Sequence, residues 1–225
     1  MVKVNDEISR PGKSKNKFRG SAFNSLNSLA AWLGVLTACM MCAAALADDP
    51  PNLVKNPGFE EVNSDGFAKA WCDKSEKKKE TLDDKIAHTG VRSIRLGVEP
   101  SSFVVCASAD IIVKPSTKYM VTWWCKTEGF TRSRAYVWLL TNKAQRTIGL
   151  QGDQRDSREW TRHFSEYTTT AEETLLNVSL TSHNVFGTQT NDPATFCWFD
   201  DVGVYEGTFP KNLEAEYRTW FSKTQ

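Results

Sequence analysis

The sequence has 225 residues, of which 40% are hydrophobic, and a formal net charge of +1. A chain of this length can bury one sizeable core even after a leader segment is set aside. The near-zero charge argues against general nucleic-acid binding, which needs a strong basic excess. Eight Trp and twelve Phe residues need burial, so the composition is not that of an acidic disordered protein.

Residues 1–47 have the layout of an export segment. Residues 1–28 are polar and basic, residues 29–47 carry no charge, and Ala45-Leu46-Ala47 is a small-x-small cleavage site. This pattern predicts a signal peptide cleaved after Ala47. Two alternatives stay open, namely a lipid on Cys39 and an apolar run retained as a membrane anchor. All three predict an exported protein, whether extracellular, periplasmic or on the cell surface.

Four cysteines follow the leader, at positions 72, 106, 125 and 197. An even number of cysteines in an exported chain predicts two disulfides, for which three pairings are possible. The alternative is that the thiols are free and buried, because Cys also packs as a small hydrophobic residue.

Short strand-like segments recur along the rest of the chain, separated by Gly and Pro. Residues 56–61 are expected to form the opening strand, and the segments that follow are 92–98, 102–106, 109–113, 118–126, 133–142, 160–167, 175–181 and 195–205. Many short strands without a helical period between them predict an all-β fold, an antiparallel β-sandwich. We assign residues 48–207 to this sandwich.

Residues 208–225 differ from the strands. Leu213, Tyr217, Trp220 and Phe221 are spaced so that they share one face of a helix. Pro210 suits the first turn of such a helix. The tail is therefore expected to be a short amphipathic helix that docks on the sandwich, and the alternative is that this face contacts a protein partner.

Residues 52–60, Asn-Leu-Val-Lys-Asn-Pro-Gly-Phe-Glu, resemble the start of jelly-roll carbohydrate-binding modules of the family 4, 9 and 22 group, which have a galactose-binding-domain-like fold. Further segments continue the resemblance in order: Trp71 and residues 88–96, 114–119, 159–164 and 199–202. It covers about residues 52–205. It implies a jelly roll that binds a carbohydrate.

The resemblance also implies a structural calcium ion that ties the two ends of the sandwich together. Its ligands would be the carboxylates of Glu60 and Asp200 and the backbone carbonyls of Gly58, His88 and Val91. Calcium binds several hard oxygen ligands and accepts backbone carbonyls among them. Asp201 is an alternative to Asp200, because neighbouring strand residues point to opposite faces.

Period-two alternation predicts the outward side chains of several strands without any family knowledge. Combined on one sheet face, these are Trp124, Tyr136, Trp138, Arg95, Arg134, Lys126, Asn177, Ser179 and Thr181. Aromatic rings pack against the apolar face of a pyranose, and the polar side chains hydrogen-bond its hydroxyls. The face is therefore expected to bind a glycan, unless the tail or a loop covers it as a second small core.

The sequence contains no nucleophile elbow, zinc-protease motif, phosphate loop or dinucleotide fingerprint. Its acidic pairs, Glu60-Glu61 and Asp200-Asp201, are sequence neighbours that point to opposite faces, so neither forms the acid/base pair of a glycosidase. We therefore expect a non-catalytic, exported carbohydrate-binding protein whose partner is a polysaccharide or cell-surface glycan. The alternative is a structural or protein-interaction sandwich of the cell envelope that binds no glycan.

Overall fold

The computed structural model describes residues 48–71, 80–98, 103–129, 133–143, 145–148, 159–184 and 195–224. The predicted export segment, residues 1–47, lies outside them. Residues 49–225 form one unit. Within the described ranges, no helix combines the length and the apolar character that crossing a bilayer would require.

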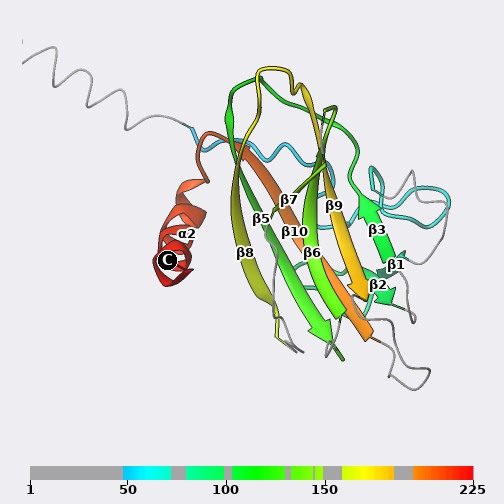
Figure 1. Cartoon of the computed structure of the whole chain (residues 1–225). Coiled ribbons are helices and arrows are strands. Elements are labelled where there is room, and N and C mark those ends of the chain that lie inside the picture. Colours follow the sequence, from blue (N-terminus) through cyan, green and yellow to red (C-terminus); the bar gives the residue numbers. More distant parts are fainter. Residues whose placement is uncertain are drawn as a thin grey trace, which may run out of the picture. The chain divides into compact units, whose positions relative to one another are not determined.

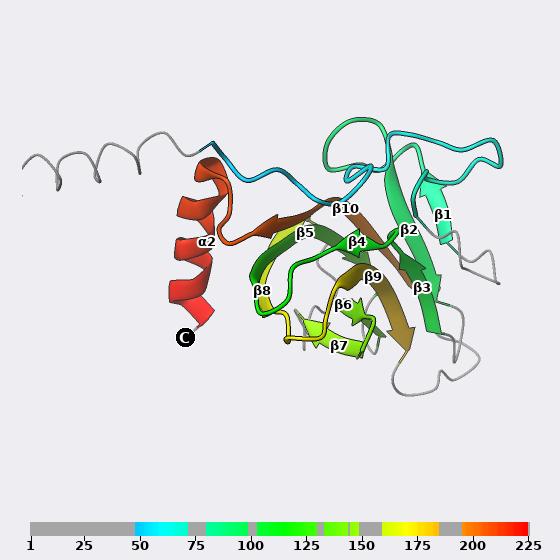
Figure 2. The ribbon, with the colours of Figure 1, turned by 90° about the horizontal axis from the view of Figure 1, so that it is seen from above.

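Two antiparallel sheets pack face to face, as expected for a jelly-roll β-sandwich (Figures 1 and 2). The first, here called sheet I, has the order β1 (Glu80–Asp83), β2 (Ser93–Val98), β10 (Thr195–Glu206), β5 (Lys118–Glu128) and β8 (Thr161–Thr168). The second, sheet II, has the order β3 (Phe103–Ala107), β9 (Leu175–Asn184), β6 (Ser133–Thr141) and β7 (Gln145–Ile148), with β4 (Ile111–Ile112) also paired to β9. The expected all-β architecture is confirmed.

The core lies between the sheets and follows from the alternation of each strand. On β5, for example, Val121, Trp123 and Cys125 point inward and are buried. Val137 and Leu139 on β6 meet them from the opposite sheet. Burial of such apolar side chains is the main favourable contribution to folding, roughly 1.5–3 kcal/mol for each large one.

Residues 56–61 form a turn and not the expected opening strand. Asn56 and Phe59 have positive φ angles of 51° and 60°, which lie outside the region of regular β-strands. The Asn56 side chain holds the turn, because its Oδ1 accepts the Glu61 N–H at 2.9 Å and its Nδ2 donates to the Glu61 carbonyl at 2.8 Å. The turn thereby inserts Phe59 into the core against Trp71, with ring centroids 4.9 Å apart.

The segment around this turn nevertheless runs beside the closing strand β10. The Leu53 N–H donates to the Val204 carbonyl at 2.9 Å, and the Val202 N–H donates to the Pro57 carbonyl at 3.0 Å. The start and the end of the sandwich are therefore joined by backbone hydrogen bonds.

The C-terminal helix α2 (Lys211–Thr224) is present and docks on the sandwich, as expected. Pro210 immediately precedes it, and the Pro210 carbonyl accepts N–H groups from Leu213 and Glu214. Leu213 and Tyr217 are buried in a second apolar cluster, together with Met120, Phe164 and Phe209. This cluster lies on the outer side of sheet I, so α2 covers part of that face.

Candidate functional site

The predicted binding face is divided between the two sheets. Arg134, Tyr136 and Trp138 on β6 and Asn177 on β9 belong to sheet II. Arg95 on β2 and Trp124 on β5 belong to sheet I. The expectation of a single face that carries all of these residues is therefore wrong.

The physical reason is a crossover between the sheets. Alternation assigns the inward and outward side chains of each strand correctly, but β5 and β6 follow one another in the chain and lie in opposite sheets. Their inward side chains share one core. Their outward side chains therefore point to opposite sides of the sandwich.

Trp124 is enclosed on its side of the sandwich. The His88 ring stacks on it, with centroids 3.7 Å apart and an interplanar angle of 19°. The Arg162 guanidinium also lies over the ring, with Cζ 4.6 Å from its centroid. Both contacts occupy ring surface of Trp124 on which a sugar would otherwise stack.

Arg95, the other expected site residue on sheet I, also has partners within the protein. Its Nη1 lies 3.9 Å from Asp83 Oδ2, and its Cζ lies 5.1 Å from the centroid of the Phe196 ring. Asp83 in turn accepts a hydrogen bond from Trp198 Nε1 at 2.9 Å. Arg95 therefore belongs to a contact network of sheet I and is remote from the residues on β6.

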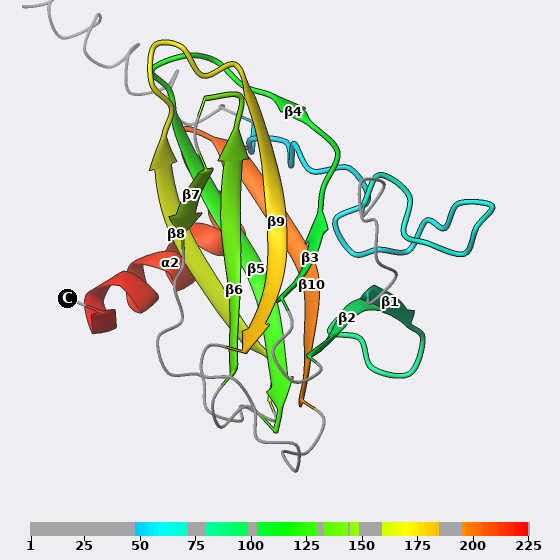
Figure 3. The same ribbon diagram turned by 45° about the vertical axis from the view of Figure 1, so that its right-hand side comes forward.

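The outer face of sheet II brings the remaining expected residues together. Strands β6 and β9 run side by side (Figure 3), with Tyr136 opposite Thr181 and Trp138 opposite Ser179. The Tyr136 and Trp138 rings stack with centroids 5.6 Å apart and an interplanar angle of 25°. Tyr136 is only 5% exposed, whereas Trp138 is half-buried and presents part of its ring.

Buried polar atoms lie beside these rings. Ser179 and Thr181 are fully buried, although both project from the outer face of the sheet. Ser179 Oγ and Asn177 Oδ1 are buried and have no hydrogen-bond partner among the described residues. Leaving such an atom unsatisfied costs about 1–3 kcal/mol, and a buried water is the usual partner of an atom enclosed in this way.

Tyr136 remains a neutral hydrogen-bonding group. Burial raises the pKa of its phenol, and this effect outweighs the opposite effect of the Arg134 charge. A neutral phenol can both donate and accept a hydrogen bond. The outer face of sheet II therefore combines stacked rings with neutral polar groups and one cation, Arg134.

Two of the expected calcium ligands are occupied by N–H donors. Glu60 Oε1 accepts the backbone N–H groups of Val91 at 2.8 Å and Arg92 at 3.0 Å. The Arg92 side chain also donates to the Glu60 carbonyl at 3.1 Å, and its Nη1 lies 3.7 Å from Glu60 Oε2. The charge of Glu60 is thus partly balanced by an arginine.

Asp200 is held in a similar way. Its Oδ2 accepts the backbone N–H groups of His88 at 2.7 Å and Thr89 at 3.2 Å, and its Oδ1 accepts the Asp201 N–H at 2.8 Å. Burial, followed by the neighbouring Asp201 charge, raises the pKa of Asp200 to about 7. Asp201, the alternative ligand, contacts His88 Nδ1 through its Oδ2 at 2.6 Å.

Glu60, Asp200, Gly58, His88 and Val91 do come together at the junction of the chain ends, as the resemblance implied. However, the N–H groups that point at both carboxylates occupy lone pairs that a cation would need. No group of three or more His, Cys, Asp or Glu side chains among the described residues could hold a metal. In this arrangement the oxygen atoms of Glu60 and Asp200 do not fit a calcium ion. The calcium site that the resemblance implies stays a prediction.

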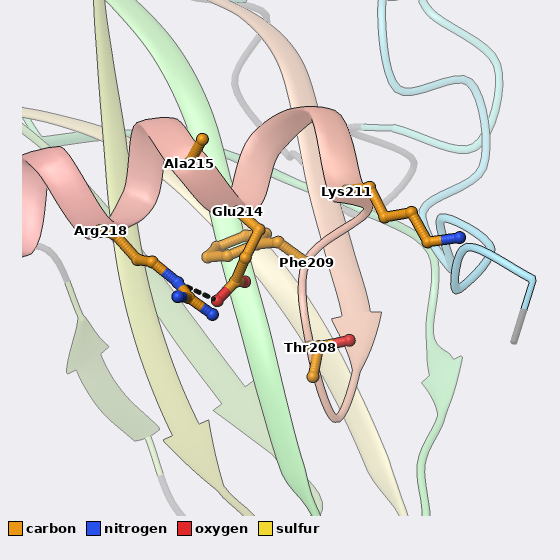
Figure 4. A pocket seen from close by; sticks show the side chains of 6 residues that line it. All are labelled: Thr208, Phe209, Lys211, Glu214, Ala215 and Arg218. Carbon is orange, nitrogen blue, oxygen red and sulfur yellow. Dashed lines mark hydrogen bonds and ion pairs between the residues drawn. The ribbon is translucent and has the colours of Figure 1, made fainter. Parts of the chain in front are cut away.

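A separate surface pocket of about 420 Å³ lies beside α2 (Figure 4). Its polar lining includes Glu214 and Arg218, which pair with each other at 3.1 Å. Phe209, which also lines it, is packed into the second apolar cluster. The pocket is lined by residues of the β10–α2 turn and of α2 itself, and it contains none of the expected site residues.

The cysteines differ from the expected pair of disulfides. Cys125 and Cys197 lie on the neighbouring strands β5 and β10 as buried free thiols. Burial raises the pKa of both, that of Cys197 to about 12, so they are inert core residues. Cys106 is disulfide-bonded, and its partner lies outside the described residues.

No protein-family model matches the chain. No curated protein matches it either. Among solved structures, it is similar to a family 61 carbohydrate-binding module in complex with β-1,4-galactotriose, at 16% identity over 69% of this chain and 99% of that one, with a TM-score of 0.48.

It is also similar to the CBM22-1 xylan-binding domain of Paenibacillus barcinonensis Xyn10C, at 12% identity over 71% of this chain and 97% of that one, with a TM-score of 0.48. A Stig cyclase from Fischerella sp. TAU is similar at 14% identity over 71% and 98% of the two chains, with a TM-score of 0.49. All three similarities are at TM-scores below 0.5 and identities below 25%.

Proposed function

We propose that this chain is an exported, non-catalytic carbohydrate-binding protein that binds a polysaccharide or cell-surface glycan on the outer face of sheet II. One observation carries the proposal. The stacked Tyr136–Trp138 pair lies beside two buried oxygen atoms, Ser179 Oγ and Asn177 Oδ1, that have no partner in the described part of the chain.

This arrangement of rings and polar groups matches the apolar face and the polar edge of a sugar ring. The C–H groups of a pyranose form an apolar face that packs on an aromatic ring, here the accessible part of Trp138. The hydroxyls at the ring edge are both donors and acceptors, so they can hydrogen-bond the half-buried amide side chain of Asn177 beside the rings.

The low exposure of Tyr136 favours a second candidate. A ring that is 5% exposed contributes little open surface, as expected if this face is packed within a structural or protein-interaction sandwich. In that case the protein would fold normally and bind no glycan. Binding experiments therefore separate the two functions.

The test is affinity electrophoresis and calorimetry of the purified protein against a panel of neutral and acidic polysaccharides. We expect binding to at least one member, and Trp138→Ala should weaken it at least about tenfold by removing the stacking surface. Trp220→Ala is the matched control, since Trp220 is another half-buried tryptophan but lies on α2 at sheet I. A folded protein that binds no member, or equal binding by the Trp138 variant, would refute the proposal.

A further inference from the structure

The stacked rings of Tyr136 and Trp138 are here called the ring platform, and Arg134 lies at one end of it on sheet II. It precedes Tyr136 and Trp138 on β6 and projects outward with them, because Ala135, Val137 and Leu139 are buried in the core. Its side chain is half-buried, and its cross-strand neighbour on β9 is His183. The side chain therefore lies on the proposed glycan face and is partly removed from solvent.

Arg134 differs from the other arginines whose side chains the structure describes. Those four are each within 4 Å of a carboxylate: Arg92 with Glu60, Arg95 with Asp83, Arg162 with Glu216 and Arg218 with Glu214. Arg134 has neither an ion pair nor a hydrogen bond of its side chain within the described ranges. Within the described ranges the Arg134 charge is therefore without a counter-charge, and its guanidinium is able to bind an anion.

Among the described residues of this face, no acidic side chain is a cross-strand or same-strand neighbour of Arg134. The outward residues that follow it on β6 are Tyr136, Trp138 and Leu140, and those on β9 are Asn177, Ser179, Thr181 and His183. The acid that contacts the face is Asp110, which accepts a hydrogen bond from Asn177 at 3.3 Å. Asn177 pairs with Leu140, at the far end of the β6–β9 register from Arg134.

We propose that Arg134 makes this face selective for an acidic glycan, binding the oxyanion of a uronic acid or sulfated sugar while Trp138 stacks a neighbouring ring. This inference rests on the proposed function. Four residues of strand separate the two positions by about 13 Å, so the anionic sugar and the stacked sugar are different units of one chain. The half-buried Asn177 side chain then contacts the stacked unit.

Arginine suits this role better than lysine. Its planar guanidinium presents paired N–H donors that match a carboxylate or sulfate, and it stays charged at all relevant pH values. Such charge-assisted hydrogen bonds are roughly twice as strong as neutral ones. One arginine can therefore make the face bind an acidic glycan more tightly than a neutral one. Binding is therefore expected to weaken as salt is raised.

The test compares acidic glycans with neutral counterparts of the same backbone. Probes are oligogalacturonate and the same oligosaccharide after reduction of its carboxyl groups, and a sulfated galactan oligosaccharide before and after desulfation. We expect at least one acidic probe to bind about tenfold or more tightly than its neutral counterpart. Arg134→Gln should abolish that difference and Arg134→Lys should keep part of it. Arg218→Gln, on α2, should leave it unchanged, with folding checked by circular dichroism.

Each outcome decides the inference. Tighter binding of a carboxylated probe or of a sulfated probe supports it and identifies the anion. Neutral probes that bind as tightly as acidic ones, or an unchanged preference in Arg134→Gln, overturn it and leave the proposed function intact. A folded protein that binds neither class contradicts both the inference and the proposed function.

Discussion

At the scale of single residues, polar groups inside the sandwich are either held by partners or kept neutral. Glu173, for example, is buried, and its carboxylate accepts hydrogen bonds from the Tyr167 hydroxyl and the Thr170 N–H, both at 2.7 Å. His163 lies beside Trp123 in the core, and burial lowers its pKa to about 4. Such a histidine stays neutral in the folded protein and is not available as a general base at the surface.

His163 should make the protein less stable in acid. Between pH 6.5 and about 4, the unfolded chain binds a proton at this residue and the folded protein does not, so stability falls as pH falls through this window. The full effect is about 3 kcal/mol in the free energy of unfolding. Denaturant unfolding at pH 7 and pH 4.5 should show a smaller loss for His163→Phe than for the original protein.

The comparison with the variant is necessary because Asp200 acts in the opposite direction. Its pKa is raised to about 7, so its contribution to stability is present at low pH and is lost as pH rises through 7. Both proteins retain Asp200. Equal pH dependence in the two would show that His163 is not the source.

The sequence predicted which side chains of a strand point outward, but it did not predict which other residues those side chains contact. The sequence correctly placed Tyr136, Trp138 and Trp124 on outward faces, because this depends only on the period of a strand. It did not predict that His88 and Arg162 enclose Trp124, since those contacts join residues remote in the sequence. No local signal marks such a long-range contact.

At the scale of elements, strong β patterns were predicted and weak ones were missed. Strands β1 and β7 are four residues each, too short for alternation to be recognised. The turn at 56–61 was mistaken for a strand, although Asn56 holds it through local hydrogen bonds to Glu61 and Asn-Pro-Gly is a turn sequence. Helix α2 was predicted because its apolar residues repeat with the helical period.

Helix α2 should contribute stability without contributing to glycan binding. Leu213→Ala leaves a cavity in the cluster around Phe164 and Phe209, which should lower the free energy of unfolding by about 2–4 kcal/mol. Phe221→Ala is the control, because Phe221 is 44% exposed and its loss should cost well under half as much. Glycan affinity should be the same in both variants. A selective loss of affinity in Leu213→Ala would indicate that the glycan binds at sheet I and not at sheet II.

At the scale of the whole molecule, the two outer faces of the sandwich differ in what lies on them. Sheet I is covered in part by α2 and by the loop that carries His88, whereas sheet II carries the ring platform and Arg134. The sequence predicted the sandwich, but we assigned residues of both sheets to a single face. The pattern of each strand does not show to which sheet that strand belongs.

The junction of the chain ends should hold without calcium. Glu60 and Asp200 already accept backbone N–H groups, so the melting temperature should be the same in excess EDTA and in millimolar calcium. If calcium does bind, a concentration 100-fold above the dissociation constant would stabilise the protein by about 2.7 kcal/mol and raise the melting temperature by roughly 5–10 °C. Such a rise would establish the calcium site that the resemblance implies.

The central claim is that the glycan lies on the outer face of sheet II. Nuclear magnetic resonance titration with the tightest-binding oligosaccharide of the panel tests it most directly, by mapping the amide and indole signals that shift. The account predicts shifts clustered at Arg134, Trp138, Asn177 and Ser179, with the Trp124 and Trp220 indoles unchanged. Shifts centred on Trp124 or α2, with β6 and β9 unaffected, would contradict it.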